Sequence, residues 1–158
     1  MWQIGVWEEN EGLGNLAEEL TRDGRAQVRT GNHPALLAGE LLDLLIVSPA
    51  AVGWAGAAAI YCRTVLLPDS AGALARSLLA DRAVSYGLSG RDTITLSSLE
   101  ENRMCVAIQR EIIRLDGGLV ERQELILPRK EGHSPELLLA QVGVHLLLGT
   151  GKEDASQE

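Results

Sequence analysis

The chain has 158 residues, a formal net charge of −8 and an aliphatic apolar content with no Phe. A chain of this length fits one domain with its own hydrophobic core. The acidic balance argues against nucleic acid and against anionic membrane surfaces as partners, because like charges repel one another.

The cysteines and the first residues predict a reduced, cytoplasmic protein. Cys62 and Cys105 stand far apart with no CxxC pair, so neither a zinc site nor a disulfide framework is expected. The N-terminal residues lack the basic and apolar regions of a signal peptide. Residues 44–62 carry no charge, but Ser48-Pro49 and many Gly and Ala favour a strand, a loop and a small-residue helix over a membrane span.

The first 89 residues alternate short apolar runs with helical runs, which is typical of βαβ units on a mostly parallel sheet. Strands are expected at residues 3–7, 26–30, 42–47, 60–67 and 82–86. Helices are expected at residues 16–21, 33–41 and 70–80, with a weak helix or packed loop at 51–59. This order predicts an α/β fold: a Rossmann-like, three-layer arrangement around a mostly parallel sheet of about five strands.

Residues 90–128 change to the two-residue period of antiparallel strands. The expected strands are 93–99, 104–111, 112–115 and 119–127, with a hairpin turn at Asp116-Gly117-Gly118. Ser134 and Pro135 then begin a helix that ends at Gly149, and its apolar residues on all sides predict burial. One domain over 1–149 and a disordered polar tail at 150–158 are therefore expected.

Two glycine-containing segments are candidate phosphate-binding loops. The first holds Gly12-x-Gly14, but Ala17 replaces the third glycine and three carboxylates crowd the loop, so a pyrophosphate would be repelled. The second, Gly149-Thr150-Gly151-Lys152, has Leu146 and Glu153 where a P-loop needs Gly and Ser or Thr. No cofactor is predicted.

Nucleophile and metal signatures are weak as well. His33, His133 and His145 are far apart in sequence, and each cysteine lies in a predicted strand without a recognisable base nearby. Such groups are more often packed or capping residues than catalytic ones. No metal site is predicted. Whether the chain is an enzyme stays open, and the missing signatures favour a non-catalytic protein.

Polar residues follow the predicted parallel strands at the edge where open α/β sheets bind ligands. The candidate binding residues are Glu8, Asn10, Asn32, His33, Ser48, Asp69 and Ser70. They suit a small-molecule pocket and equally suit ordinary solvated loops.

From about Thr64 onward the chain resembles the latter part of the central domain of Mur ligases, the ATP-dependent amino-acid ligases of peptidoglycan synthesis. The similar segments are Val65-Leu66-Leu67-Pro68-Asp69, then residues 83–89, the antiparallel strands, and Gly132-His133 before an apolar helix. The resemblance implies a bacterial protein with a related backbone. It does not imply the ligase activity, since the family's P-loop is missing and Ser134 stands where the family has Asn after the His.

Two functions follow as hypotheses. The first is a non-catalytic module that binds a partner protein or its own copy, because the antiparallel strands can present a free edge. The second is a small-molecule-binding or enzymatic domain with a pocket at the strand ends.

Overall fold

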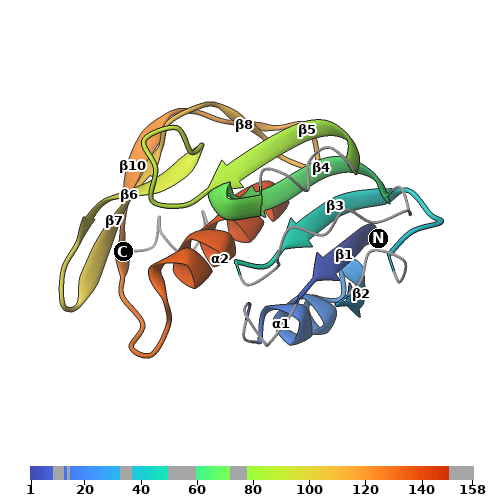
Figure 1. Ribbon diagram of the computed structural model, residues 1–158, viewed down its shortest axis with the longest axis horizontal. Coiled ribbons are helices and arrows are strands. Elements are labelled where there is room, and N and C mark those ends of the chain that lie inside the picture. The colour runs from blue at the N-terminus through green and yellow to red at the C-terminus, as the bar shows by residue number, and fades with distance from the viewer. Residues whose placement is uncertain (9–12, 14, 33–36, 50–59, 72–77, 150–158) are drawn as a thin grey trace.

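One eight-stranded sheet is the frame of the molecule in the computed structural model, which describes residues 1–8, 13, 15–32, 37–49, 60–71 and 78–149 (Figure 1). Its strands are β1 (Trp2–Trp7), β2 (Ala26–Gly31), β3 (Leu42–Val47), β4 (Ile60–Pro68), β5 (Leu78–Tyr86), β6 (Ile94–Leu99), β7 (Arg103–Ile108) and β10 (Gln123–Pro128). The order across the sheet is β10-β7-β6-β5-β4-β3-β1-β2. The described helices are α1 (Leu16–Asp23) and α2 (Pro135–Leu148), and β8 (Ile112–Ile113) pairs with β9 (Leu119–Val120) in a small separate sheet.

The first five strands are parallel, which confirms the predicted α/β class. β1 lies between β2 and β3, and β3, β4 and β5 follow in order. β6 adds to β5 by the single pair Tyr86 and Ile94, and β7 and β10 then run antiparallel. The antiparallel strands therefore continue the main sheet.

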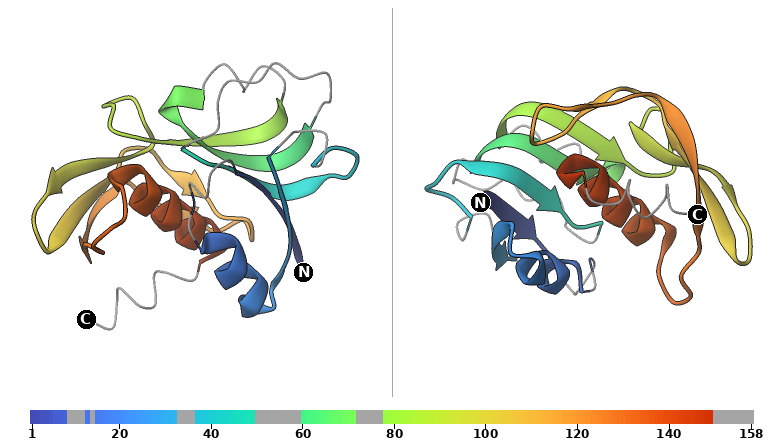
Figure 2. Two further views of the ribbon diagram at one scale, coloured as in Figure 1. Left: turned by 60° about the horizontal axis from the view of Figure 1, so that its bottom comes forward. Right: turned by 180° about the vertical axis from the view of Figure 1, so that it is seen from behind.

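Both faces of the central strands are buried. α1 and α2 cover one face (Figure 2), where Ile46 of β3 and Leu66 of β4 join the larger core cluster. Leu45 and Val65, their neighbours in sequence, join a second cluster on the opposite face. The weak helix or packed loop predicted at residues 51–59 lies outside the described residues, as does most of the helix predicted at 70–80.

α2 has the caps and the burial that its sequence predicts. The Ser134 hydroxyl oxygen accepts a hydrogen bond from the Leu137 N–H at 3.2 Å, and Pro135 occupies the first turn. Gly149 ends the helix in the left-handed region at φ 76°. Leucine and valine side chains are buried along nearly all of the helix, so α2 packs on several sides. None of the described helices is both long and apolar enough to cross a membrane.

Several predicted boundaries are wrong, and three of these differences follow directly from the backbone and the strand pairing. Residues 37–41 are not helical, because Gly39 takes the left-handed φ of 109° and interrupts the turn. Residues 78–80 belong to β5, since Leu78 already pairs with Ile60 of β4. The single strand expected at 119–127 is divided because β9 pairs with β8 whereas β10 pairs with β7.

Candidate functional site

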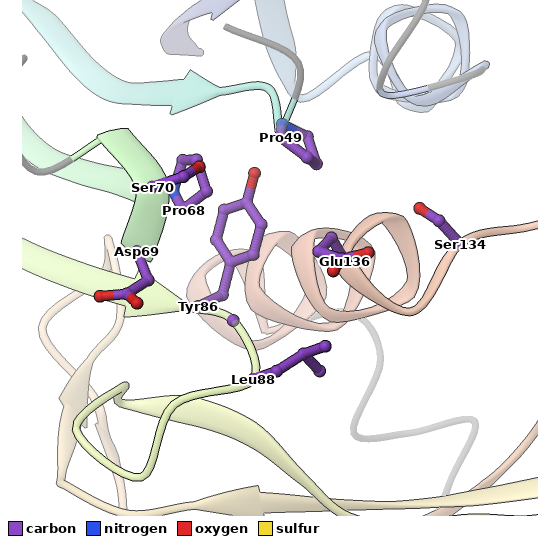
Figure 3. A pocket seen from close by; sticks show the side chains of 9 residues that line it. Pro49, Pro68, Asp69, Ser70, Tyr86, Leu88, Ser134 and Glu136 are labelled. Carbon is purple, nitrogen blue, oxygen red and sulfur yellow. The ribbon is translucent and has the colours of Figure 1, made fainter. Parts of the chain in front are cut away.

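A cavity of about 480 Å³ lies at the carboxyl ends of β3, β4 and β5, where the N-terminus of α2 meets the sheet (Figure 3). Ligands of open parallel sheets bind at this edge. The lining residues are Pro49, Pro68, Asp69, Ser70, Tyr86, Gly87, Leu88, Ser134 and Glu136.

The cavity has a buried floor and an exposed rim. Pro68, Tyr86 and Gly87 are buried beneath it, whereas Asp69, Ser70, Leu88 and Ser134 are exposed around it. Pro49 and Glu136 are half-buried walls. Such a combination of a preformed apolar floor and a polar rim is usual in small-molecule sites.

Tyr86 holds the floor in place. Its side chain is fully buried, and its hydroxyl donates a hydrogen bond to the Val47 carbonyl at 2.5 Å. This bond joins the end of β5 to the end of β3 across β4. Burial raises the pKa of the Tyr86 phenol, and the nearby Glu136 charge raises it further, so the phenol remains protonated at neutral pH.

A turn after β5 supports the floor of the cavity at Gly87. The Ser89 N–H donates to the Asp92 carboxylate at 3.0 Å, and the Asp92 N–H donates to the Ser89 carbonyl at 3.0 Å. The Gly87 N–H donates to the Ile94 carbonyl at 3.1 Å. A Cβ at Gly87 would lie 2.7 Å from an Asp92 carboxylate oxygen, so only glycine leaves room for this packing.

The described part of the lining is acidic. Among the described residues that line the cavity, Asp69 and Glu136 carry carboxylates and none is basic. Behind Gly87, the Asp92 side chain is only 1% exposed. Burial raises the pKa of the Asp92 carboxyl and the charge of Asp69 raises it further, while hydrogen bonds from Ser89 and Ser85 and the charge of Arg110 act in the opposite direction.

The N-terminus of α2 faces this site with its partial positive charge already compensated. Ser134 caps the Leu137 N–H, and Glu136 places a carboxylate in the first turn. A carboxylate at this position is stabilised by the helix dipole. The helix end therefore does not turn the cavity into an anion site.

A second hollow of about 890 Å³ lies beside α1 and β2 and contains Glu8. Its described lining comes from residues 8–30, and none of these described side chains is buried. The Glu8 carboxylate accepts a hydrogen bond from the Leu13 N–H at 3.1 Å. Glu8 thus holds the start of the α1 region in place by this hydrogen bond, and the hollow beside it has no buried residue in its described lining.

The structure separates the predicted site residues. Asp69 and Ser70 line the cavity, but Glu8 lies at the second hollow. Ser48 is fully buried and its N–H donates to the Trp7 carbonyl at 2.9 Å, so β1 and β3 remain joined past their ends. Asn32 is exposed and lines neither hollow. Asn10 and His33 lie outside the described residues.

Several lining residues were not among the predicted ones. Three of them end or follow β5: Tyr86, Gly87 and Leu88. The rule that ligands bind at the carboxyl ends of parallel strands was applied to β1 through β4, and applying it to β5 as well could have found them. Ser134 and Glu136 had no such signal, because the sequence does not tell which edge of the sheet a distant helix will meet.

The described cysteines show no activated thiol. Cys62 is buried, and burial raises its pKa to about 11, with a smaller contribution from Asp81. The Cys105 thiol donates a hydrogen bond to a Glu124 carboxylate oxygen at 3.8 Å, and no histidine base is among its described partners. Within the described ranges, no group of three His, Cys, Asp or Glu side chains is arranged to hold a metal ion.

Comparison with known proteins found no matching family model, no matching curated protein and no matching solved structure. The resemblance to Mur ligases therefore stays a prediction.

Proposed function

We propose that this protein is a binding module that holds a small molecule in the cavity at the carboxyl ends of β3, β4 and β5. The cavity itself carries the proposal, because it combines three strand ends with the first turn of a capped helix. Its volume of about 480 Å³ lies within the range of small-ligand sites.

Two of the hydroxyl groups at the cavity, those of Tyr86 and Ser134, support binding without catalysis. The Tyr86 hydroxyl gives its proton to the Val47 carbonyl, and the Ser134 oxygen accepts the Leu137 N–H. An activated nucleophile needs a base in hydrogen-bond reach. Neither hydroxyl has a basic partner among its described bonds, so both serve the fold at this site.

Filling the cavity should abolish binding. We expect some members of a panel of neutral, cationic and anionic fragments to shift the backbone amide signals of Gly87 and Leu88 in a heteronuclear NMR spectrum. Ser70 is exposed on the rim, so Ser70→Trp should weaken these fragments by about tenfold or more, because the indole would occupy their volume.

The matched control is Ser98→Trp, which places the same indole at an exposed serine of β6 that does not line the cavity. This variant should bind the fragments as the unchanged protein does. Equal binding by Ser70→Trp, or shifts confined to amides away from the cavity, would overturn the proposed function.

Self-association is a second candidate function, favoured by the edge strand β10. In the described part of the chain β10 pairs only with β7, and Ile126 on it is 67% exposed. A free strand edge can pair with a second copy. Sedimentation velocity should then show a dimer that Ile126→Lys weakens and that Leu79→Lys, at an exposed residue of β5, leaves unchanged. A monomer at all concentrations would contradict this function.

A further inference from the structure

The turn at residues 87–93 connects β5 to β6 and supplies Gly87 and Leu88 to the cavity. The Leu88 side chain is 59% exposed on the rim (Figure 3), so the path of this turn sets where the rim lies. A group that fastens or loosens the turn therefore regulates the cavity, an inference that rests on the proposed function.

The buried carboxylate of Asp92 fastens this turn from behind the cavity. Asp92 is 1% exposed, and its carboxylate accepts the Ser89 N–H at 3.0 Å. It also accepts a hydrogen bond from Ser85 of β5. One carboxylate oxygen lies 2.7 Å from the point that a Cβ of Gly87 would occupy. The Asp92 side chain thus ties the first half of the turn to the end of β5.

The second half of the turn is held by bonds that do not involve this carboxylate. The Gln109 side-chain amide donates to the Asp92 carbonyl at 2.6 Å and to the Gly90 carbonyl at 3.1 Å. The Thr93 N–H donates to the Ser85 hydroxyl oxygen at 3.0 Å. Weakening the carboxylate bonds would therefore loosen residues 88 and 89 first and leave residues 90–93 in place.

The surroundings of Asp92 favour the neutral form of its carboxyl. Among the described residues, the charged side chains that act on it are Asp69 after β4 and Arg110 after β7. The Asp69 Cβ lies 3.2 Å from the same Gly87 point, so the two aspartates approach Gly87 from two elements. Burial raises the pKa of Asp92 and the Asp69 charge raises it further, and together they outweigh the hydrogen bonds and the Arg110 charge, which lower it.

We propose that Asp92 is a proton-sensitive positioning residue of the cavity, whose carboxylate fixes the turn and the rim at neutral pH and whose protonation loosens them in mild acid. A hydrogen bond to a carboxylate is about twice as strong as one to a neutral acceptor, so a neutral Asp92 holds the Ser89 N–H less firmly. Because its pKa is raised by folding, Asp92 contributes stability that is fully present below its unfolded-state pKa and is lost as pH rises through the folded-state value. Protonation of Asp92 thus loosens the turn locally and does not favour unfolding of the chain.

An NMR titration of the unchanged protein from about pH 7 to about pH 3 tests this proposal, with the Asp92 carboxyl carbon and the Ser89 amide followed together. Both signals should move with one midpoint, above the ordinary range of aspartate. The protection of the Ser89 amide against hydrogen exchange should be lower by about threefold or more on the acid side of that midpoint. Asp92→Asn should abolish the titration of the Ser89 amide. Asp69→Asn should lower the Asp92 midpoint, because it removes a like charge.

Asp116 is the matched control, since its carboxylate also accepts a backbone N–H, that of Gly118 at 2.8 Å, but in an exposed turn. This bond lowers the pKa of Asp116, so the Gly118 amide should titrate below the ordinary range of aspartate in the same spectra. Asp116→Asn should leave the titration of the Ser89 amide unchanged.

An Asp92 midpoint within or below the ordinary range of aspartate contradicts the proposal, and so does a Ser89 amide that does not follow Asp92. The unchanged protein gives this answer even if Asp92→Asn does not fold. These readouts need no ligand, so their failure leaves the proposed function standing on the fragment shifts at neutral pH. Absence of those fragment shifts would contradict the proposed function and leave the titration of Asp92 as a property of the turn.

Discussion

Replacing Gly143 by Leu is expected to lower the free energy of unfolding by about 3 kcal/mol, because α2 packs too closely on the sheet to admit a side chain there. A Cβ at Gly143 would lie 2.9 Å from one Leu66 methyl carbon and 3.2 Å from the Ile94 methyl carbon. A leucine adds three further carbons beyond that atom. Helix and sheet would have to separate, and the larger core cluster would open. Urea unfolding measures this loss.

Alanine at the same position separates packing from helix propensity. Gly143→Ala gains about 1 kcal/mol of intrinsic helix stability, and its single methyl meets only the flexible ends of Leu66 and Ile94. We expect the two effects to cancel to within about 1 kcal/mol. If Gly143→Leu unfolds at the same urea concentration as the unchanged protein, the close approach of α2 to β4 is wrong.

Tyr86→Ala is expected to lower the free energy of unfolding by about 3–5 kcal/mol, since it removes a fully buried aromatic side chain and leaves a void beneath the cavity. Tyr86→Phe keeps the ring and removes only the hydroxyl that bonds to the Val47 carbonyl. That bond contributes about 1 kcal/mol. The difference between the two variants therefore measures the packing of the ring, and both are measured by urea unfolding.

Tyr61→Ala is the matched control for this pair. Tyr61 lies on β4 and is 49% exposed, so its loss should cost less than about 1 kcal/mol. Equal stability of Tyr86→Ala and Tyr61→Ala would show that the floor of the cavity is not the core position described above. An unchanged stability of Tyr86→Phe would show that the bond between the ends of β5 and β3 contributes nothing.

Local sequence signals are sufficient to predict the elements that are stabilised by residues nearby in the chain. β3 is predicted to the residue, because Leu42–Val47 is an apolar run stopped by Ser48-Pro49. The caps of α2 at Ser134 and Gly149 were likewise readable, since a cap satisfies backbone groups only a few residues away. The local pattern at the start of β5 predicts a helix. The segment is a strand because its pairing with β4 outweighs that local pattern.

The sequence by itself determined the α/β class, the parallel order of its first half and the edge of the sheet where polar residues gather. These depend on the period of apolar residues and on caps and turns, which are local. Only the tertiary structure decided that Asp69 and Ser70 share a cavity with Tyr86 and Glu136, while Glu8 lies elsewhere and Ser48 is buried. The reason is that strand order and the docking of α2 are set by burial between segments far apart in the chain.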